Sequence, residues 1–153
     1  MIIELDDFEV KLCEYIGELR STIARKSNVI DAKIGKQNGI DADIQGFKAE
    51  YAFAKLYNLF PDFGLGARSG SCDGKTRHGT RYDIKSTNRK DGNLLSTLKV
   101  NNDVDVYVLA YVNENMVEFI GWIDKQSFIK EENIRDMGHG KGYFFNRNKL
   151  NLF

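Results

Sequence analysis

The segment RYDIKST (Arg81–Thr87) alternates polar and apolar side chains, as a β-strand with one buried face does. The turn-forming residues HGT come just before it, and the turn DGNLL follows. Because residues two apart project from the same face of a strand, we expect Asp83 and Lys85 to point to one side and Tyr82 and Ile84 to the other. The segment therefore predicts a strand that places a carboxylate and an ammonium group side by side.

Two further strands are predicted downstream. VDVYVLAYV (Val104–Val112) is rich in β-branched and aromatic residues and continuous enough to be buried on both faces. The turn NEN separates it from MVEFIGWI (Met116–Ile123), a second strand. DKQSFIKEENI then indicates a short helix that begins at Asp124, and GYFFNRNKLNLF indicates a last strand or an irregular tail.

Two helices are predicted upstream. Asp6 or Asp7 is a suitable cap for a first helix that runs to about Ala24, because apolar residues recur there at helical spacing. The stretch RKSNVIDAKIGKQNGIDADI has no clean period and indicates a loop or a short helical turn. Asp41 or Asp43 is then expected to cap a second helix, QGFKAEYAFAKLYNL, which ends before the chain's single proline.

The order of elements and the composition predict one domain over residues 1–153. Helices first, then strands, then a short helix indicate an α/β fold with α+β-like order, in which a central mixed sheet is flanked by helices. The 42% apolar and 29% charged residues are typical of a water-soluble domain. No window approaches the roughly 18 apolar residues of a membrane helix, and the acidic N-terminus is unlike a secretory signal. We therefore expect a cytoplasmic protein with no membrane partner.

Positive charge is concentrated in one segment, although the formal net charge is zero. Residues 68–99 carry 8 Lys/Arg against 3 Asp/Glu. This segment is either a surface for a polyanion or a solvated hairpin face. The two cysteines, Cys13 and Cys72, have neither the spacing nor the histidine partners of a zinc site, and a disulfide framework is not expected.

The tripeptide GKT (Gly74, Lys75, Thr76) matches the end of a nucleotide-binding P-loop. The P-loop also requires a glycine five residues before Gly74, where this chain has Ser69. A turn and a strand follow the tripeptide, whereas a P-loop continues into a helix whose N-terminus holds phosphate. The sequence therefore disfavours a nucleotide-binding site here.

An acidic residue two before a lysine occurs four times in the chain, and only Asp83-Ile84-Lys85 lies in a convincing strand. A carboxylate can hold Mg²⁺, and the lysine can position or help to deprotonate an attacking water. A surface ion pair would use the same two residue types. Asp73 supplies a second carboxylate if it ends the other strand of the hairpin.

Glu50 is a third candidate acid, because it lies on an apolar stripe of the second helix. An acidic side chain in such surroundings needs a partner. A metal site would provide one. The alternative is a glutamate at the helix boundary that reaches water or pairs with Lys48 or with a distant arginine.

The order GFKAEYAFAKL, an aspartate, DIKST, DVYVLAYV and a strand ending in GWI resembles the PD-(D/E)XK nuclease superfamily. It is most similar to small phage and microbial members with a G-x-x-x-E helix before the catalytic hairpin. The resemblance covers about residues 44–123 and implies a restriction-endonuclease-like catalytic core. Residues 1–43 would then be an N-terminal helical segment, and residues 124–153 a C-terminal helix and tail.

The resemblance also implies a set of site residues. Asp73 and Asp83 would bind the metal, with Glu50 completing or supporting the site. Lys85 would be the catalytic lysine, and the backbone carbonyl of Ile84 would join the metal ligands. Cys72 stands where the family pattern has proline, a variation that the family tolerates.

The implied function is a Mg²⁺-dependent nuclease, in particular a DNA endonuclease, in which Mn²⁺ substitutes for Mg²⁺. The expected partner is nucleic acid, and we expect either a homodimer or an enzyme guided by DNA structure or by another protein. The alternative is a non-catalytic nucleic-acid-binding domain with a nuclease fold. Residues expected to contact phosphate are Arg77, Arg81, Ser86, Thr87, Arg89 and Lys90, of which the two hydroxyl residues are equally explained as the end of a strand.

Overall fold

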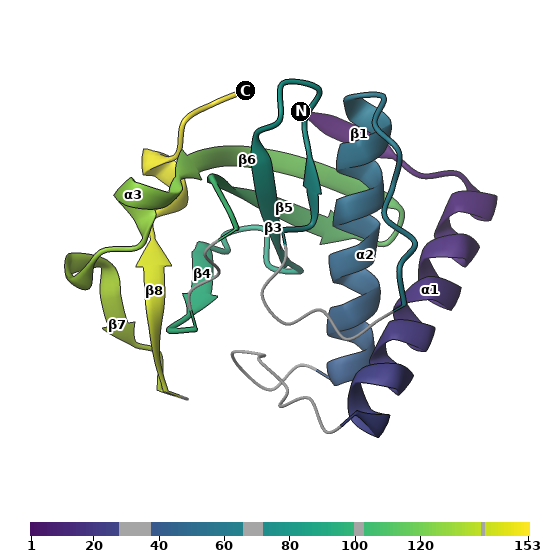
Figure 1. Cartoon of the computed structure of the whole chain (residues 1–153), viewed down its shortest axis with the longest axis horizontal. Helices are drawn as coiled ribbons and strands as arrows, with labels where there is room; N and C mark the ends of the chain where they lie inside the picture. The colour runs from purple at the N-terminus through teal and green to yellow at the C-terminus, as the bar shows by residue number, and fades with distance from the viewer. Residues whose placement is uncertain (28–37, 66–71, 100–102, 139) are drawn as a thin grey trace.

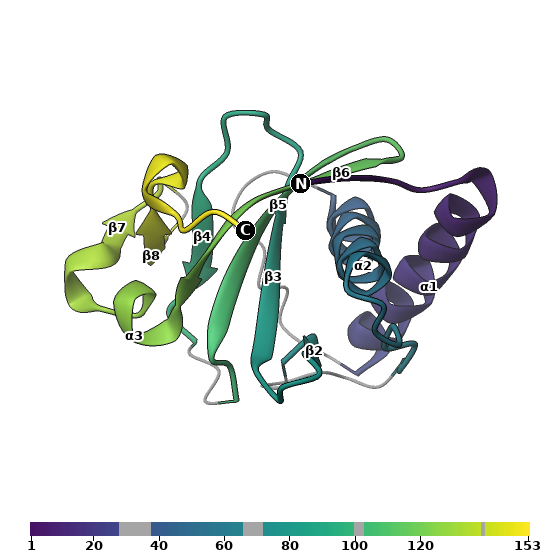
Figure 2. The same cartoon turned by 90° about the horizontal axis from the view of Figure 1, so that it is seen from above.

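A computed structural model describes residues 1–27, 38–65, 72–99, 103–138 and 140–153. A five-stranded mixed sheet lies at its centre. Two long helices cover one face of this sheet, and a smaller three-stranded sheet with a short helix lies on the other side (Figures 1 and 2). The structure thus confirms the expected central mixed sheet flanked by helices.

The elements have the following bounds. The helices are α1 (Asp7–Lys26), α2 (Gly39–Leu56) and α3 (Lys125–Phe128), with short 3-10 turns at Glu131–Asn133 and Arg147–Lys149. The large sheet has the order β1 (Ile2–Glu4), β6 (Met116–Asp124), β5 (Val106–Asn113), β3 (Arg81–Thr87) and β2 (Gly74–Lys75). The small sheet has the order β4 (Leu94–Thr97), β8 (Lys141–Phe145) and β7 (Ile134–Asp136).

Strand β3 has the bounds that the alternation predicts, and it runs parallel to β5. Strand β5 lies between β3 and β6, and its residues from Tyr107 to Ala110 are all buried, as expected for a strand covered on both faces. The other pairs in this sheet are antiparallel. Because β2 has two residues and β3 has seven, most of one edge of β3 is unpaired by β2.

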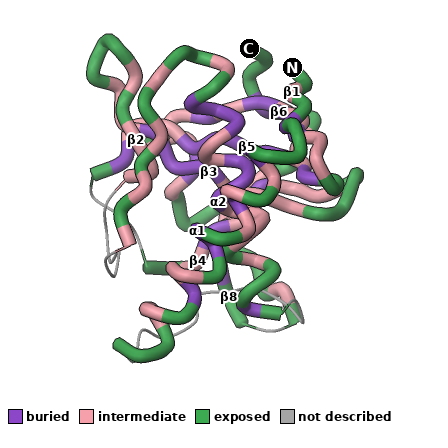
Figure 3. The backbone as a smooth tube through the Cα atoms, turned by 90° about the vertical axis from the view of Figure 1, so that its right-hand side faces the viewer, coloured by how far each residue is buried: buried purple, intermediate pink, exposed green. Residues whose placement is uncertain are grey.

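Each face of the sheet has its own apolar core. On the helix side, Tyr82 and Ile84 of β3 pack with Phe47 and Phe53 of α2. On the other side, Tyr107 of β5 packs in a second core with residues of α3, β4 and β8. Figure 3 shows the buried segments concentrated in the strands and in α2. The alternation along β3 therefore directs Asp83 and Lys85 away from the helices.

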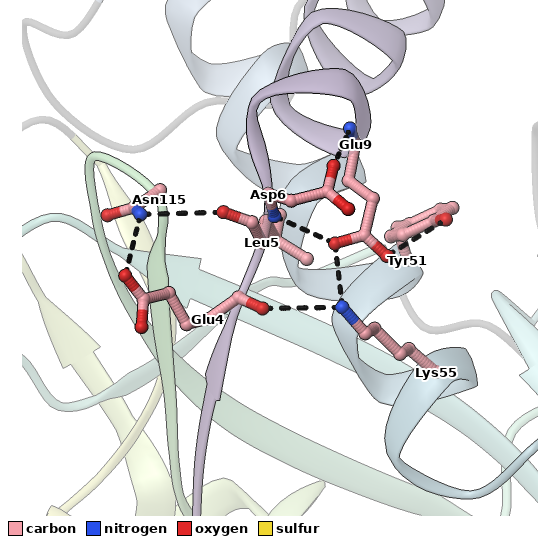
Figure 4. Close-up of polar contacts among 7 residues, drawn as sticks. All are labelled: Glu4, Leu5, Asp6, Glu9, Tyr51, Lys55 and Asn115. Carbon is pink, nitrogen blue, oxygen red and sulfur yellow. Dashed lines mark hydrogen bonds and ion pairs between the residues drawn. The ribbon is translucent and has the colours of Figure 1, made fainter.

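A fully paired polar cluster anchors β1 and the start of α1 to α2 (Figure 4). Asp6 and Glu9 form a capping box, in which each side chain accepts a hydrogen bond of 2.9 Å from the other's amide. Lys55 Nζ lies 2.6 Å from Glu9 Oε2 and also donates to the Glu4 carbonyl at 3.3 Å. The hydroxyl of Tyr51 completes the environment of Glu9, at 3.4 Å. We call Asp6, Glu9, Tyr51 and Lys55 the Glu9 cluster.

Helix α1 ends two residues beyond its predicted end, and its predicted cap at Asp6 is confirmed. The predicted caps of α2, Asp41 and Asp43, are wrong. The side chain of Asn38 accepts a hydrogen bond from the amide of Ile40 at 3.2 Å, so α2 begins before either aspartate. Part of the loop or turn expected before this helix, residues 28–37, lies outside the described residues.

Strand β1 and the strands β4 and β7 of the small sheet were not predicted, whereas the last strand expected in GYFFNRNKLNLF corresponds to β8. The expected turn DGNLL is wrong in its second half, because Leu94 and Leu95 belong to β4 and pair with β8. The turn NEN and the short helix capped by Asp124 are confirmed. Among the helices of the described segments, none combines the length and the apolar character needed to cross a membrane.

Candidate functional site

The hairpin of β2 and β3 brings Asp73 beside β3. Gly74 pairs with Tyr82 and Lys75 with Arg81, and Asp73 is the residue just before this paired segment. The turn is closed by hydrogen bonds of 2.9 Å from Thr76 N to the Thr80 carbonyl and from Gly79 N to the Thr76 carbonyl. Gly79 has a φ of +86°, which glycine adopts without strain.

The GKT tripeptide lies in the β2–β3 hairpin. Gly74 and Lys75 form β2, and no helix follows them. A Cβ on Gly74 would lie 2.2 Å from the hydroxyl oxygen of Tyr82. The glycine is therefore needed for close packing on Tyr82, and the P-loop interpretation has no structural support.

Asp73 binds the unpaired edge of β3. Its amide donates to the Tyr82 carbonyl at 2.9 Å, and its Oδ2 accepts from the Ile84 amide at 2.7 Å. The N–H and C=O of one residue point to the same side of an extended strand. The carbonyl of Ile84 therefore faces the same edge as the Asp73 carboxylate.

Asp83 and Lys85 lie two residues apart in β3 and form an ion pair. Lys85 Nζ lies 2.6 Å from Asp83 Oδ1, and the Asp83 side chain is about nine-tenths buried, with 11% of its surface exposed. Within the described residues, this buried Oδ1 accepts no well-directed hydrogen bond. A buried oxygen without a well-directed hydrogen bond is a position where water or an ion is expected to bind.

Glu50 approaches the site from α2, and Arg20 of α1 holds it. Arg20 Nη1 lies 2.8 Å from Glu50 Oε2. The same guanidinium donates to the carbonyls of Asp62 and Gly64 and stacks 4.3 Å above the ring centre of Phe47. The alternative interpretation of Glu50, pairing with a distant arginine, thus describes a contact that the structure contains.

The surroundings of Asp73 oppose the ionisation of its carboxyl group. Burial raises the pKa of Asp73 well above its usual value, and the nearby Glu50 and Asp83 carboxylates raise it further. Lys85 and the Ile84 amide offset only part of this rise. Burial alone would lower the pKa of Lys85, but Asp83 and Asp73 together raise it above its usual value. We call Glu50, Asp73, Asp83 and Lys85 the Asp73 cluster.

The Asp73 cluster fits a divalent cation in part. The carboxylates of Asp83 and Asp73 are hard oxygen ligands, which Mg²⁺ prefers, although Asp83 Oδ1 already contacts Lys85 Nζ. In the described part of the chain, no three His, Cys, Asp or Glu side chains lie close enough together to form a ligand group on their own. Mg²⁺ is often bound by one or two carboxylates together with substrate phosphate and water, so two aspartates are sufficient for such a site.

The residues expected to contact phosphate lie at both ends of β3. Arg77 is exposed at the hairpin tip, whereas Arg89 and Lys90 are exposed in the turn after β3. Arg89 pairs with Asp91 at 3.3 Å. Ser86 and Thr87 end the strand, and Thr87 Oγ1 accepts a hydrogen bond from the Arg89 amide at 3.2 Å.

Arg81 has a structural role in the described fold. Its side chain donates to Asp105 at 2.7 and 3.0 Å and to Asp103 at 3.3 Å, and its amide donates to Asp105 at 2.8 Å. These contacts join the starts of β3 and β5. Two arginines of the basic segment, Arg81 and Arg89, are therefore largely neutralised, and Arg68 lies outside the described residues.

Arg20 is the residue of this site that the sequence did not reveal. It is one of several charged residues on α1, and its partners lie 30 to 44 positions away. The apolar stripe around Glu50 was the available signal, because a buried carboxylate requires a positive partner. That signal identifies the kind of partner without identifying the residue.

Residues 3–122 match the model of a family of unknown function (DUF5843), and the chain belongs to this family. The matched region contains every residue of the Asp73 cluster together with Arg20. No curated protein and no solved structure matches the chain.

Proposed function

We propose that this protein is a metal-dependent nuclease that hydrolyses phosphodiester bonds, with DNA as its substrate. The observation that carries the proposal is the environment of Asp73 at the edge of β3, beside the Asp83–Lys85 ion pair. Burial raises the pKa of Asp73, and the neighbouring Glu50 and Asp83 carboxylates raise it further. Perturbed acids of this kind are typical of functional sites.

The order of the residues along the chain supports the same proposal. A helix acid, a hairpin aspartate and an acidic-x-Lys strand follow one another as in the PD-(D/E)XK nucleases, which the sequence resembles. In this proposal Asp73, Asp83 and the Ile84 carbonyl hold Mg²⁺ or Mn²⁺. The metal, when bound, supplies a Lewis acid for the phosphate and a more acidic water.

Lys85 supplies the positive charge of the site. Its raised pKa keeps Nζ protonated near neutral pH, which favours hydrogen bonding to the attacking water or to a phosphate oxygen over proton abstraction. Asp83 fixes the position of Nζ through the 2.6 Å contact. Glu50, held by Arg20, adds negative charge that strengthens cation binding without needing to leave its own ion pair.

A non-catalytic nucleic-acid-binding domain is the second candidate. It is favoured by the positive charge of residues 68–99, where Lys75, Arg77 and Lys90 are exposed. It requires nucleic-acid binding that does not depend on metal. The nuclease requires both metal dependence and Lys85.

Cleavage assays on supercoiled plasmid and on single-stranded DNA, with Mg²⁺, Mn²⁺ or EDTA, test the proposal. We expect cleavage with either metal and none in EDTA. Lys85→Ala should lower the cleavage rate by about 100-fold or more, since charge stabilisation in an active site contributes on that order. The control is Lys130→Ala, which removes an exposed lysine whose partner is Glu132, at 3.7 Å.

Two outcomes would reject the nuclease. One is equal cleavage by the wild type and by Lys85→Ala, which would indicate a contaminating enzyme. The other is the absence of cleavage on any nucleic acid with either metal. Binding without cleavage would then assign the chain to the second candidate.

A further inference from the structure

Phe60 is an exposed aromatic side chain on the segment that follows α2. It leaves 87% of its surface exposed, and Tyr57, three positions earlier, leaves 39% exposed. Exposed apolar groups that lie together mark binding surfaces more often than single exposed residues do. The segment therefore presents aromatic faces that the fold itself does not cover.

The segment is fixed in place, so Phe60 has a defined position. Arg20 donates to the carbonyls of Asp62 and Gly64, and the Asp62 side chain accepts from the Gly64 amide at 2.8 Å. The ring of Phe60 meets the ring of Phe63 edge-on, with 5.7 Å between their centres. Arg20 also holds Glu50, so one side chain ties this segment to the Asp73 cluster.

Two cations of the hairpin lie beside this aromatic segment. Arg77, at the tip, donates to the carbonyl of Asn58 at 3.4 Å, and Figure 2 shows β2 on the side of the sheet that faces the end of α2. Lys75 is exposed on β2. Among the described residues, no carboxylate pairs with either cation, which distinguishes them from Arg81 and Arg89.

The same hairpin arm leads from these cations to the site. Lys75 lies on β2, and Asp73 lies two residues before it, at a bend. A strand of nucleic acid whose phosphates contact Arg77 and Lys75 is therefore held two residues along the chain from Asp73. Arg20 joins the aromatic segment to Glu50 of the same cluster.

We propose that Phe60 and Tyr57, with Arg77 and Lys75, bind an unpaired segment of nucleic acid. A base stacks on Phe60, and the neighbouring phosphates contact the two cations. Aromatic faces beside positive charges are the usual means of binding single strands, whereas the bases of a duplex are already stacked on one another. The inference rests on the proposed function for its substrate, and it specifies a single strand or the single-stranded arm of a branched DNA.

Fluorescence anisotropy in EDTA measures this binding without cleavage. The probes are a labelled oligothymidylate and a blunt duplex of the same length. Loss of stacking in Phe60→Ala should weaken binding of the single strand by roughly 5- to 150-fold. Phe60→Trp should bind at least as tightly as the wild type, and Arg77→Gln should lower the slope of log K against log salt by about 0.7.

The matched control is Phe8→Ala, because Phe8 is also an exposed phenylalanine, with 74% of its surface exposed, and lies on α1. It should bind like the wild type. Equal affinity of Phe60→Ala and the wild type would overturn the proposal, as would equal affinity for the duplex. A Phe60-dependent dimer in sedimentation, without binding of the single strand, would assign the surface to self-association and also overturn it.

The outcomes separate this inference from the proposed catalysis. Phe60-dependent binding in a protein that cleaves nothing would uphold the surface and reject the nuclease. Cleavage that does not depend on Phe60 would uphold the nuclease and reject the surface.

Discussion

The Glu9 cluster and the Asp73 cluster each contain carboxylates and one lysine, but the negative charge of the carboxylates is compensated to different degrees. Glu9 has an amide donor from Asp6, the ammonium of Lys55 at 2.6 Å and the hydroxyl of Tyr51. Asp73 has one amide donor, two neighbouring carboxylates and a lysine that already pairs with Asp83. The first cluster satisfies its own groups and joins elements of the fold.

The Asp73 cluster leaves uncompensated negative charge in the described structure, because its one lysine pairs with Asp83. Such an arrangement lowers stability unless another group binds there, because like charges are held together in a partly buried place. Functional sites are the usual location of this kind of conflict. The Glu9 cluster therefore has a structural role, and we propose a binding role for the Asp73 cluster.

The largest expected difference between the clusters is in activity. Asp83→Asn keeps the shape of the side chain and removes its charge, so the cleavage rate should fall by about 100-fold or more. Glu9→Gln should change the rate less than threefold, because Glu9 lies outside the site. Rates are measured in the plasmid assay at saturating Mg²⁺. Comparable losses in both variants would mean that the two clusters do not differ in function.

Substitution in the Glu9 cluster should reduce stability more than substitution in the Asp73 cluster, which is the reverse of the order expected for cleavage. Glu9→Ala removes one member of the capping box and leaves Lys55 without its carboxylate, so the free energy of unfolding should fall by about 2–3 kcal/mol. Asp83→Asn should change it by less than about 1 kcal/mol, because Lys85 keeps Asp73 as a neighbouring carboxylate and the repulsion between Asp83 and Asp73 is lost. Urea unfolding followed by circular dichroism measures both. A larger loss in Asp83→Asn would show that the Asp73 cluster holds the fold together.

Asp73→Asn should increase stability by about 1 kcal/mol in metal-free buffer at neutral pH, on the scale of other substitutions that remove functional strain. The amide oxygen can still accept the Ile84 hydrogen bond, while the repulsion from Glu50 and Asp83 is lost. A decrease in stability would mean that the Asp73 charge is needed to bind the edge of β3.

The pH dependence of this difference has a definite sign. The folded-state pKa of Asp73 is raised, so the folded protein binds the proton more tightly than the unfolded chain. The cost of ionising Asp73 is absent below the ordinary aspartate pKa of about 4, grows as the pH rises from there to the raised folded-state pKa, and is constant above it. The advantage of Asp73→Asn should therefore be small near pH 4 and should increase with pH until it reaches a plateau. Urea unfolding in EDTA over this range measures it.

The sequence predicted the local features of the site and missed its long-range contacts. Alternation placed β3 correctly and put Asp83 and Lys85 on one face, because a strand's period depends on adjacent residues alone. The cap of α2 was missed because Asn38, Asp41 and Asp43 lie within six residues and all are suitable cap residues. Asn38 is the one whose side chain accepts a hydrogen bond from the Ile40 amide.

The partners that lie far away in the chain could not be predicted. Strand β4 pairs with β8 across about fifty residues, and nothing in Leu94 or Leu95 indicates that pairing. Arg20 reaches Glu50 because α1 and α2 pack side by side, a tertiary contact without a local pattern. Whether the Asp73 cluster binds metal and cleaves DNA stays a prediction.

Thermal unfolding with and without divalent cations tests the binding role of the Asp73 cluster most directly. At a Mg²⁺ or Mn²⁺ concentration about 100 times the dissociation constant, the free energy of unfolding of the wild type should rise by about 2.7 kcal/mol. Glu9→Gln should show the same rise, and the double variant Asp73→Asn/Asp83→Asn should show none. An equal rise in the double variant, or no rise in the wild type with either metal, would contradict the account.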